Sequence, residues 1–125
     1  MVKLAPRIVL LVAALLMLAG GVLHAFAFRG AASALSGASL PGFYSGSFKA
    51  LWLIDSATLI ALAALFAFIA FRPSSASRWV LVFLALIPAA TASLMFLFVG
   101  PFFPAYVFVI AAGAVFAAGA MWRAV

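Results

Sequence analysis

The chain has 125 residues, of which 71% are hydrophobic and only 6% are charged, and its formal net charge is +6 at pH 7. A soluble domain carries about a quarter charged residues, and a chain of this size has too little interior to bury so much apolar surface. A water-soluble globular domain is therefore excluded. With one acidic residue, one histidine and no cysteine, the chain also lacks the residues for paired-carboxylate catalysis, thiol chemistry, disulfides and thiolate metal sites.

Four apolar stretches are long enough, or nearly long enough, to cross a bilayer. A spanning helix needs roughly 20 apolar residues, because the hydrocarbon core is about 30 Å thick and each helical residue rises about 1.5 Å. The stretches are continuous rather than alternating, which excludes the strands of a transmembrane β-barrel. The sequence therefore predicts an all-α, integral membrane four-helix bundle that forms a single domain over residues 1–125. The expected transmembrane spans cover residues 8–28, 50–71, 79–99 and 105–122.

The first span contains one ionisable residue, His24, and follows the basic residues Lys3 and Arg7. Basic residues, an apolar run and the small residues Ala25 and Ala27 are together typical of a cleavable secretory signal. The apolar run of about twenty residues is longer than the roughly 7–15 of a signal peptide. We therefore expect this segment to be an uncleaved transmembrane helix.

The segment from Gly30 to Ser47 is rich in glycine, serine and alanine and is expected to connect the first two spans. Within it, residues 31–39 are candidates for a short interfacial helix, and Phe43, Tyr44 and Phe48 are candidate anchors at the headgroup level. The favoured interpretation is a simple interfacial connector. The alternative is a cover over the outer mouth of the bundle.

The second span carries the other ionisable residue, Asp55. Counted from Arg29 and Lys49, His24 and Asp55 both lie roughly 8–9 Å below the outer ends of their spans, at about 1.5 Å per residue. Consecutive spans are usually neighbours, and an ionisable group facing lipid costs a few kcal/mol or more. The sequence therefore predicts that His24 and Asp55 face each other within direct or one-water hydrogen-bond reach.

Other polar side chains occur at a similar depth. Ser56 and Thr58 flank Asp55, and helical periodicity places Asp55 on one face with Trp52 and with either Thr58 or Leu59. The candidate polar or proton site comprises His24, Asp55, Thr58, Thr91 and Tyr106. Two interpretations remain open: interhelical hydrogen bonds worth about 0.6 kcal/mol each on average, or a site for a proton or a cationic ligand. One histidine and one aspartate are too few ligands for a metal, and we expect no cofactor.

The third and fourth spans carry signals for helix shape and packing. Pro88 lies in the middle of the third span and removes a backbone hydrogen bond, so we expect a kink near this residue, with a packing role favoured over a gating hinge. In the fourth span, small residues recur four apart at Gly113 and Ala117 and at Ala114 and Ala118. Such residues allow close helix contact, either within one bundle or with another membrane protein.

The basic residues predict the orientation in the membrane. With four spans, one side of the membrane holds Lys3, Arg7, Arg72, Arg78 and Arg123. The other side holds only Arg29 and Lys49. This positive-inside bias predicts that both termini are cytoplasmic, in a bacterial-type inner (plasma) membrane. The aromatic residues favour the same assignment, since Trp79 and Trp122 fall at the expected inner ends and Trp52 and Tyr106 near the outer ends.

These observations favour a small, non-enzymatic membrane protein that packs as a homo-oligomer or as an accessory subunit of a larger membrane complex. The alternative is a proton-linked transporter of a small molecule or cation that uses Asp55 and His24; an enzyme acting on lipid ranks third. Nucleic-acid binding is disfavoured because the basic residues flank the spans. A water-accessible cavity at Asp55 would favour transport, whereas a dry, packed Asp55 would favour a structural role.

Overall fold

The computed structural model describes residues 3–122, and these form four long helices and one short 3-10 turn. The helices are α1 (Leu4–Ser36), α2 (Gly42–Phe71), α3 (Arg78–Phe98) and α4 (Phe103–Met121), with the turn η1 (Pro73–Ser75) between α2 and α3. Each of the four helices is long and apolar enough to cross a membrane. The predicted all-helical fold with four candidate spans is confirmed in this respect.

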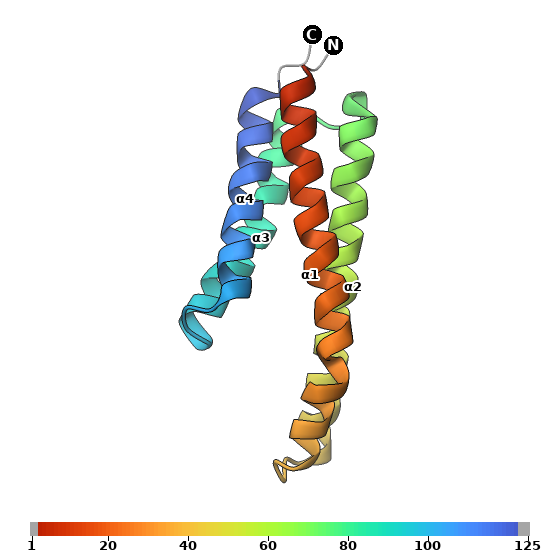
Figure 1. Ribbon diagram of the computed structural model, residues 1–125, viewed down its shortest axis with the longest axis vertical. Helices are drawn as coiled ribbons and strands as arrows, with labels where there is room; N and C mark the ends of the chain where they lie inside the picture. Colours follow the sequence, from red (N-terminus) through yellow and green to blue (C-terminus); the bar gives the residue numbers. More distant parts are fainter. Residues whose placement is uncertain (1–2, 123–125) are drawn as a thin grey trace.

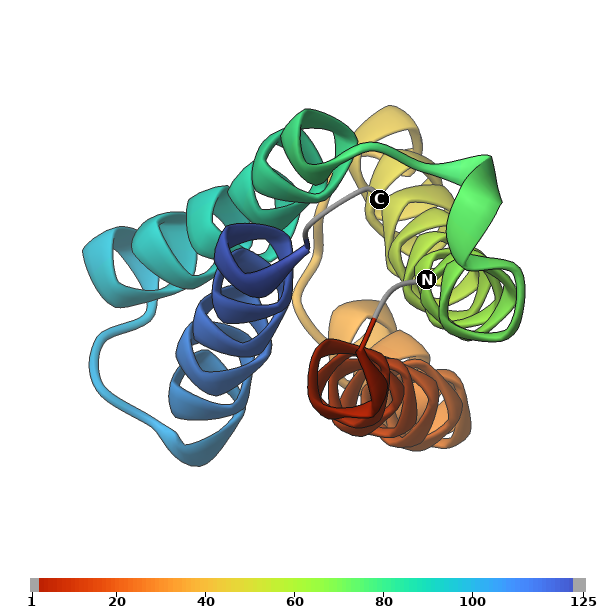
Figure 2. The same ribbon diagram turned by 90° about the horizontal axis from the view of Figure 1, so that it is seen from above.

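The four helices form two antiparallel pairs. α1 packs against α2, α3 packs against α4, and α1 also packs against α4 (Figure 2). The start of α1, the end of α2, the start of α3 and the end of α4 lie at the same end of the molecule (Figure 1). We call this end, which holds Lys3, Arg7, Arg72 and Arg78, the basic end; the opposite end, with the α1–α2 and α3–α4 turns, is the hairpin end. Arg123, which belongs to the predicted charge pattern, lies outside the described residues.

The best-packed part of the core lies toward the basic end. Leu10 of α1, Phe66 of α2, Leu81 of α3 and Val115 of α4 are all fully buried there. Glycine brings α3 and α4 close together, since a Cβ added at Gly119 would lie 3.1 Å from the Leu81 Cβ. The small residues of α4 thus serve packing inside the chain at Gly119.

Trp122 is buried at the basic end of the bundle. Its side chain is only 2% exposed, and its indole Nε1–H donates to the backbone oxygen of Ala76, in the linker between α2 and α3, at 3.1 Å. The expectation that Trp122 belongs to an aromatic belt at the membrane surface is therefore wrong. Its N–H is used inside the protein, whereas Trp79 is exposed as such a belt requires.

α1 and α2 are longer than the predicted spans. α1 has 33 residues and α2 has 30, which at about 1.5 Å per residue correspond to roughly 50 and 45 Å, against a hydrocarbon core of about 30 Å. α3 and α4, with 21 and 19 residues, match that thickness. The α1–α2 pair consequently extends well beyond α3 and α4 at the hairpin end (Figure 1).

The expected connector between the first two spans is mostly helix. α1 continues to Ser36 and α2 begins at Gly42, so only residues 37–41 form the turn. The alanine-rich composition of residues 31–35 explains this, because alanine has the highest helix propensity. Phe43 and Tyr44 lie in the first turn of α2 at the far tip of the pair, so the idea that this segment covers the mouth of the bundle is wrong.

Pro88 is fully buried inside α3, which is one continuous helix from Arg78 to Phe98. Its burial supports the packing interpretation of this proline. Gly113, in contrast, has open space around it, so within residues 3–122 this member of the predicted small-residue stripe does not contact a neighbouring helix.

Candidate functional site

A large cavity lies where the α3–α4 pair diverges from the α1–α2 pair. It has a volume of about 550 Å³ and is bounded by α1, α2, the end of α3 and the start of α4. Most of its lining is apolar or aromatic, and its ionisable lining residues are His24 and Asp55. The lining residues are Leu16, Met17, Ala19, Gly20, Leu23, His24, Ala27, Trp52, Asp55, Leu59, Met95, Phe102, Phe103, Pro104, Val107 and Phe108.

His24 and Asp55 face each other across α1 and α2. The Nδ1 atom of His24 lies 3.7 Å from Oδ2 of Asp55, so the predicted proximity is present. This separation is longer than a hydrogen bond. The match in depth also holds, since His24 lies 12 residues before the end of α1 at Ser36 and Asp55 lies 13 residues after the start of α2 at Gly42. Measured from these helix ends the depth is roughly 18–20 Å, about twice the prediction.

The direct hydrogen-bond partner of His24 is Ser56. Nδ1 of His24 lies 2.9 Å from Oγ of Ser56, and the Ser56 hydroxyl donates to the backbone oxygen of Trp52 at 3.0 Å. A hydroxyl group has one proton. Because Ser56 gives its proton to Trp52, its oxygen must accept from Nδ1–H of His24. The arrangement therefore selects the Nδ1-protonated tautomer of the neutral ring, which leaves Nε2 as an acceptor.

Trp52 positions the same imidazole in two ways. Its indole ring stacks on the His24 ring, with centroids 4.1 Å apart and planes 8° from parallel. Its Nε1–H also donates to the backbone oxygen of His24 at 2.7 Å. Both contacts join α1 to α2, so Trp52 is part of the site, although the sequence pointed to it as a membrane-surface residue as well as a member of this helix face.

Close approach of the two helices makes these contacts possible. A Cβ added at Gly21 would lie 2.9 Å from Cγ1 of Ile60 and 3.0 Å from the backbone oxygen of Ser56. Any side chain at Gly21 would push α2 away at the level of Ser56. Glycine at position 21 thus allows α2 to approach His24, whereas at Gly20 the atom nearest to an added Cβ, Cδ1 of Leu59, is at 4.0 Å.

The other predicted site residues are not brought to the cavity. Thr58 is exposed and donates to Ile54 of its own helix, and Thr91 donates to Ile87 in the same way. Tyr106 is exposed and packs edge-on against Phe96 at 5.2 Å between ring centroids. On α2 it is Leu59, not Thr58, that continues the inward face. The hydroxyl that does belong to the site, Ser56, is 3% exposed.

The remaining geometry leaves Asp55 available to a ligand. Its side chain is 43% exposed, against 26% for His24, and it lines the cavity. The nearest base, His24, is hydrogen-bonded to Ser56 instead. A carboxylate in apolar surroundings is strongly stabilised by a nearby cation or hydrogen-bond donor. The site is therefore suited to bind a ligand that carries one.

Comparison with known proteins gives no relative for this chain. No protein-family model, no curated protein and no solved structure matches it.

Proposed function

We propose that this chain is a small, non-enzymatic membrane protein that binds an amphipathic organic cation in the cavity between its two helix pairs. The observation that carries this proposal is the partly exposed carboxylate of Asp55, the only acidic side chain of the sequence, in the wall of a largely apolar cavity. A protonated or quaternary amine would pair with Asp55, and its apolar body would occupy the rest of the cavity.

The size and lining of the cavity support a ligand of this kind. Small-molecule sites typically have volumes of about 300–1,000 Å³ and combine apolar walls with a few polar groups; this cavity has about 550 Å³. Phe102, Phe103 and Phe108 contribute aromatic rings on the side opposite Asp55. Aromatic faces attract cations, so both walls favour positive charge.

The position of the cavity supports transport as the role of this binding. The two helix pairs pack closely toward the basic end, where Leu10, Phe66 and Leu81 are fully buried, and they diverge from each other toward the hairpin end (Figure 1). A cavity between helix pairs that pack closely at one end and diverge at the other is suited to be one state of an alternating-access cycle. A proton carried by Asp55 or His24 and exchanged for the cation would make the transport proton-linked.

Binding of tetraphenylphosphonium, a permanent apolar cation, tests the proposal. The purified chain in mild detergent should bind radiolabelled tetraphenylphosphonium, and Asp55→Asn should reduce the affinity at least about tenfold, equivalent to the loss of one charge-assisted interaction of roughly 1.5 kcal/mol. The matched control is Thr58→Val, one turn away but exposed and bonded within its own helix, which should bind as the unmodified chain does. Equal binding by Asp55→Asn would contradict the proposal.

We also propose the orientation with both termini in the cytoplasm of an inner (plasma) membrane. Its support is the excess of basic residues at the basic end, which follows the positive-inside rule. A cytoplasm-active reporter fused after Arg123 and a periplasm-active reporter inserted in residues 37–41 should both give signal. A silent C-terminal reporter would contradict the orientation or the even number of spans.

A second candidate function is that of a homo-oligomer or accessory subunit. The observation that favours it is the overhang of α1 and α2, whose tip exposes Leu40, Phe43 and Tyr44 beyond the ends of α3 and α4. Apolar side chains outside the span of the shorter helices are suited to contact another membrane protein. The elution position of the purified chain, alone or with a partner, tests this candidate.

A further inference from the structure

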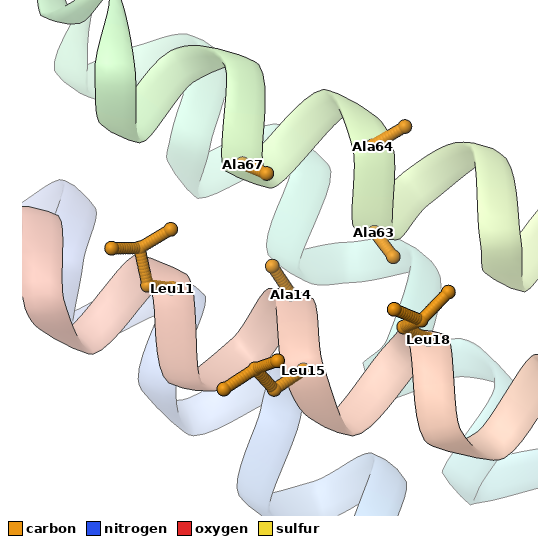
Figure 3. Close-up of a pocket in the computed structure, with 7 residues that line it drawn as sticks. All are labelled: Leu11, Ala14, Leu15, Leu18, Ala63, Ala64 and Ala67. Carbon is orange, nitrogen blue, oxygen red and sulfur yellow. The ribbon is translucent and has the colours of Figure 1, made fainter.

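A second apolar hollow lies on the other side of the α1–α2 contact, away from the cavity described above. It is a groove of about 160 Å³ with apolar lining residues, between Leu11, Ala14 and Leu18 of α1 and Ala64 and Ala67 of α2 (Figure 3). The hollow exists because alanines on α2 stand opposite leucines on α1. An apolar cavity of roughly 150 Å³ is enough to hold a benzene molecule, so this groove can hold a section of an acyl chain.

The groove is continued toward the basic end by Arg7. Residues 7, 11, 14 and 18 form one stripe on α1, since residues three and four apart share a helix face. The Arg7 side chain crosses to α2, where its Nε–H donates to the backbone oxygen of Ala70 at 2.7 Å, one turn beyond Ala67 of the groove. This bond uses one of the five N–H donors of the guanidinium and fixes the cation at the end of the groove.

The charge at this end has no acidic side chain to balance it. Lys3 directly precedes α1 and Arg72 directly follows α2, so three basic residues belong to the same end of the same helix pair. The only acidic side chain in the sequence, Asp55, is 15 residues from Ala70 along α2, or roughly 22 Å. No acidic side chain of the sequence therefore lies close enough to neutralise these basic residues.

We propose that the α1–α2 groove and Arg7 form a binding site for an anionic phospholipid. The phosphate pairs with the Arg7 guanidinium, with Lys3 and Arg72 nearby, and one acyl chain runs from there along the groove past Leu11 toward Leu18. The order of charge and then apolar groove, from the helix ends inward, is the order of headgroup and chain in a bilayer leaflet. Basic sites between membrane helices are suited to anionic headgroups. This site is separate from the Asp55 cavity and does not depend on its ligand.

Lipid-dependent stabilisation of the purified chain tests the site. The unfolding temperature in detergent should rise on titration with dioleoyl phosphatidylglycerol and rise less with dioleoyl phosphatidylcholine, because a ligand of the folded state stabilises it by mass action. Inorganic phosphate alone should not reproduce the effect, since it lacks the chain that fills the groove.

Three variants separate the groove from general attraction to charge. Arg7→Gln should raise the half-saturating concentration of phosphatidylglycerol about fivefold, the change equivalent to ~1 kcal/mol for one arginine at an anionic surface. Ala64→Leu fills the groove from its exposed rim and should also weaken phosphatidylglycerol binding, with every arginine in place. Arg78→Gln, a matched loss of charge at the same end but over the Trp79 ring on α3, should leave binding unchanged.

The proposal is overturned by any of three results: equal stabilisation by the two lipids, full stabilisation by inorganic phosphate, or an equal loss in Arg7→Gln and Arg78→Gln. Arg7 also joins α1 to α2, so Arg7→Gln can fail to fold. In that case Ala64→Leu decides: weaker phosphatidylglycerol binding than in Ala120→Leu, an exposed alanine on α4, supports the site, and equal binding overturns it.

Discussion

The imidazole of His24 lies flat on the indole of Trp52, with ring centroids 4.1 Å apart and an angle of 8° between the planes. The same indole donates its N–H to the backbone oxygen of His24. Trp52 thereby holds both the ring and the backbone of the residue that faces Asp55. A side chain fixed in this way can present one ring nitrogen to Ser56 and keep the other free, which is the arrangement that a proton-exchanging or ligand-binding site requires.

The first prediction concerns the proton on the His24 ring. The chain contains one histidine, so ¹⁵N-histidine labelling gives the signals of a single imidazole. We expect the neutral ring to carry its proton on Nδ1, because the Ser56 hydroxyl is already a donor to Trp52 and can only accept from His24. Nitrogen shifts and couplings to the ring protons distinguish the two tautomers.

Ser56→Ala provides the control for the tautomer. Without the hydroxyl, the Nδ1–H loses its acceptor, and the nearest remaining one is Oδ2 of Asp55 at 3.7 Å. The Nδ1 resonance should move, and it should move again when Asp55→Asn is added. A spectrum dominated by the Nε2-protonated ring in the unmodified chain would show that the Ser56 hydroxyl points elsewhere.

A second prediction tests the close contact of α1 and α2. Gly21→Ala should destabilise the fold by about 1–3 kcal/mol through overpacking, because the new Cβ would meet Ile60 and Ser56 at 2.9–3.0 Å. Gly20→Ala makes the same substitution at the adjacent position, where the atom nearest to the added Cβ is 4.0 Å away. It should be neutral or stabilising by up to about 1 kcal/mol through helix propensity. Unfolding titrations in mixed detergent micelles, followed by circular dichroism, measure both.

The same pair of variants reports on the site. Because Gly21 faces the backbone oxygen of Ser56, Gly21→Ala should also lengthen the bond between Ser56 and His24 and change the His24 nitrogen shifts, whereas Gly20→Ala should leave them unchanged. If the two variants are equally stable and give the same His24 spectrum, the close approach at Gly21 is not what holds the site together.

The sequence predicted which residues are helical better than it predicted where helices end. Long apolar runs are sufficient for four helices, since each must satisfy its own backbone in lipid. They do not mark the end of α1, because the residues after Arg29 are small and alanine-rich and can continue the helix outside the apolar run. The hairpin overhang follows from pairing of α1 with α2 along their length, which is tertiary information.

The candidate site was predicted in part, and the misses have one physical cause. Depth along a helix is fixed by residue count, so His24 and Asp55 could be matched. Rotation about the helix axis is not fixed by residue count in a span that is apolar all round, and neighbouring positions differ by about 100°. Of the two alternatives Thr58 and Leu59, it is therefore Leu59 that faces inward, and Ser56, which the sequence placed only beside Asp55, is buried against His24. Thr91 and Tyr106 are missed for the same reason, since Met95 of α3 and Val107 and Phe108 of α4 line the cavity in their place.

The third prediction concerns the small residues of α4. Gly119→Ala should destabilise the fold, because its Cβ would lie 3.1 Å from the Leu81 Cβ and 3.2 Å from the backbone oxygen of Arg78. Neither of these atoms can move away by a side-chain rotation. Gly113→Ala, in open space, should instead stabilise the helix by about 0.5–1 kcal/mol. An equal effect of the two substitutions on the detergent unfolding midpoint would contradict the close α3–α4 contact. Stabilisation by Gly113→Ala measured in the monomeric fraction, but loss of a higher oligomer, would assign Gly113 to a contact between copies.

The last prediction concerns Trp122, which ties the end of α4 to the linker between α2 and α3. The indole is buried among residues of the core and donates to Ala76, so it joins the two helix pairs at the end where the bundle is closed. Trp122→Phe keeps an aromatic ring but loses the bond to Ala76, and it should cost about 1 kcal/mol. Trp122→Ala also leaves a cavity and should cost about 3–5 kcal/mol.

Trp79→Phe is the matched control, because Trp79 is exposed and near the same end. A phenyl ring can still lie under the Arg78 guanidinium, now 4.7 Å from the indole centroid, so the unfolding midpoint should change by no more than about 0.5 kcal/mol. Since Trp122 closes the basic end, Trp122→Ala should also raise the leak of tetraphenylphosphonium through proteoliposomes if the chain is a transporter. A cost for Trp79→Phe as large as that for Trp122→Phe would mean that the aromatic residues act at the membrane surface, as the sequence alone suggested, and that the buried indole is not what holds the basic end closed.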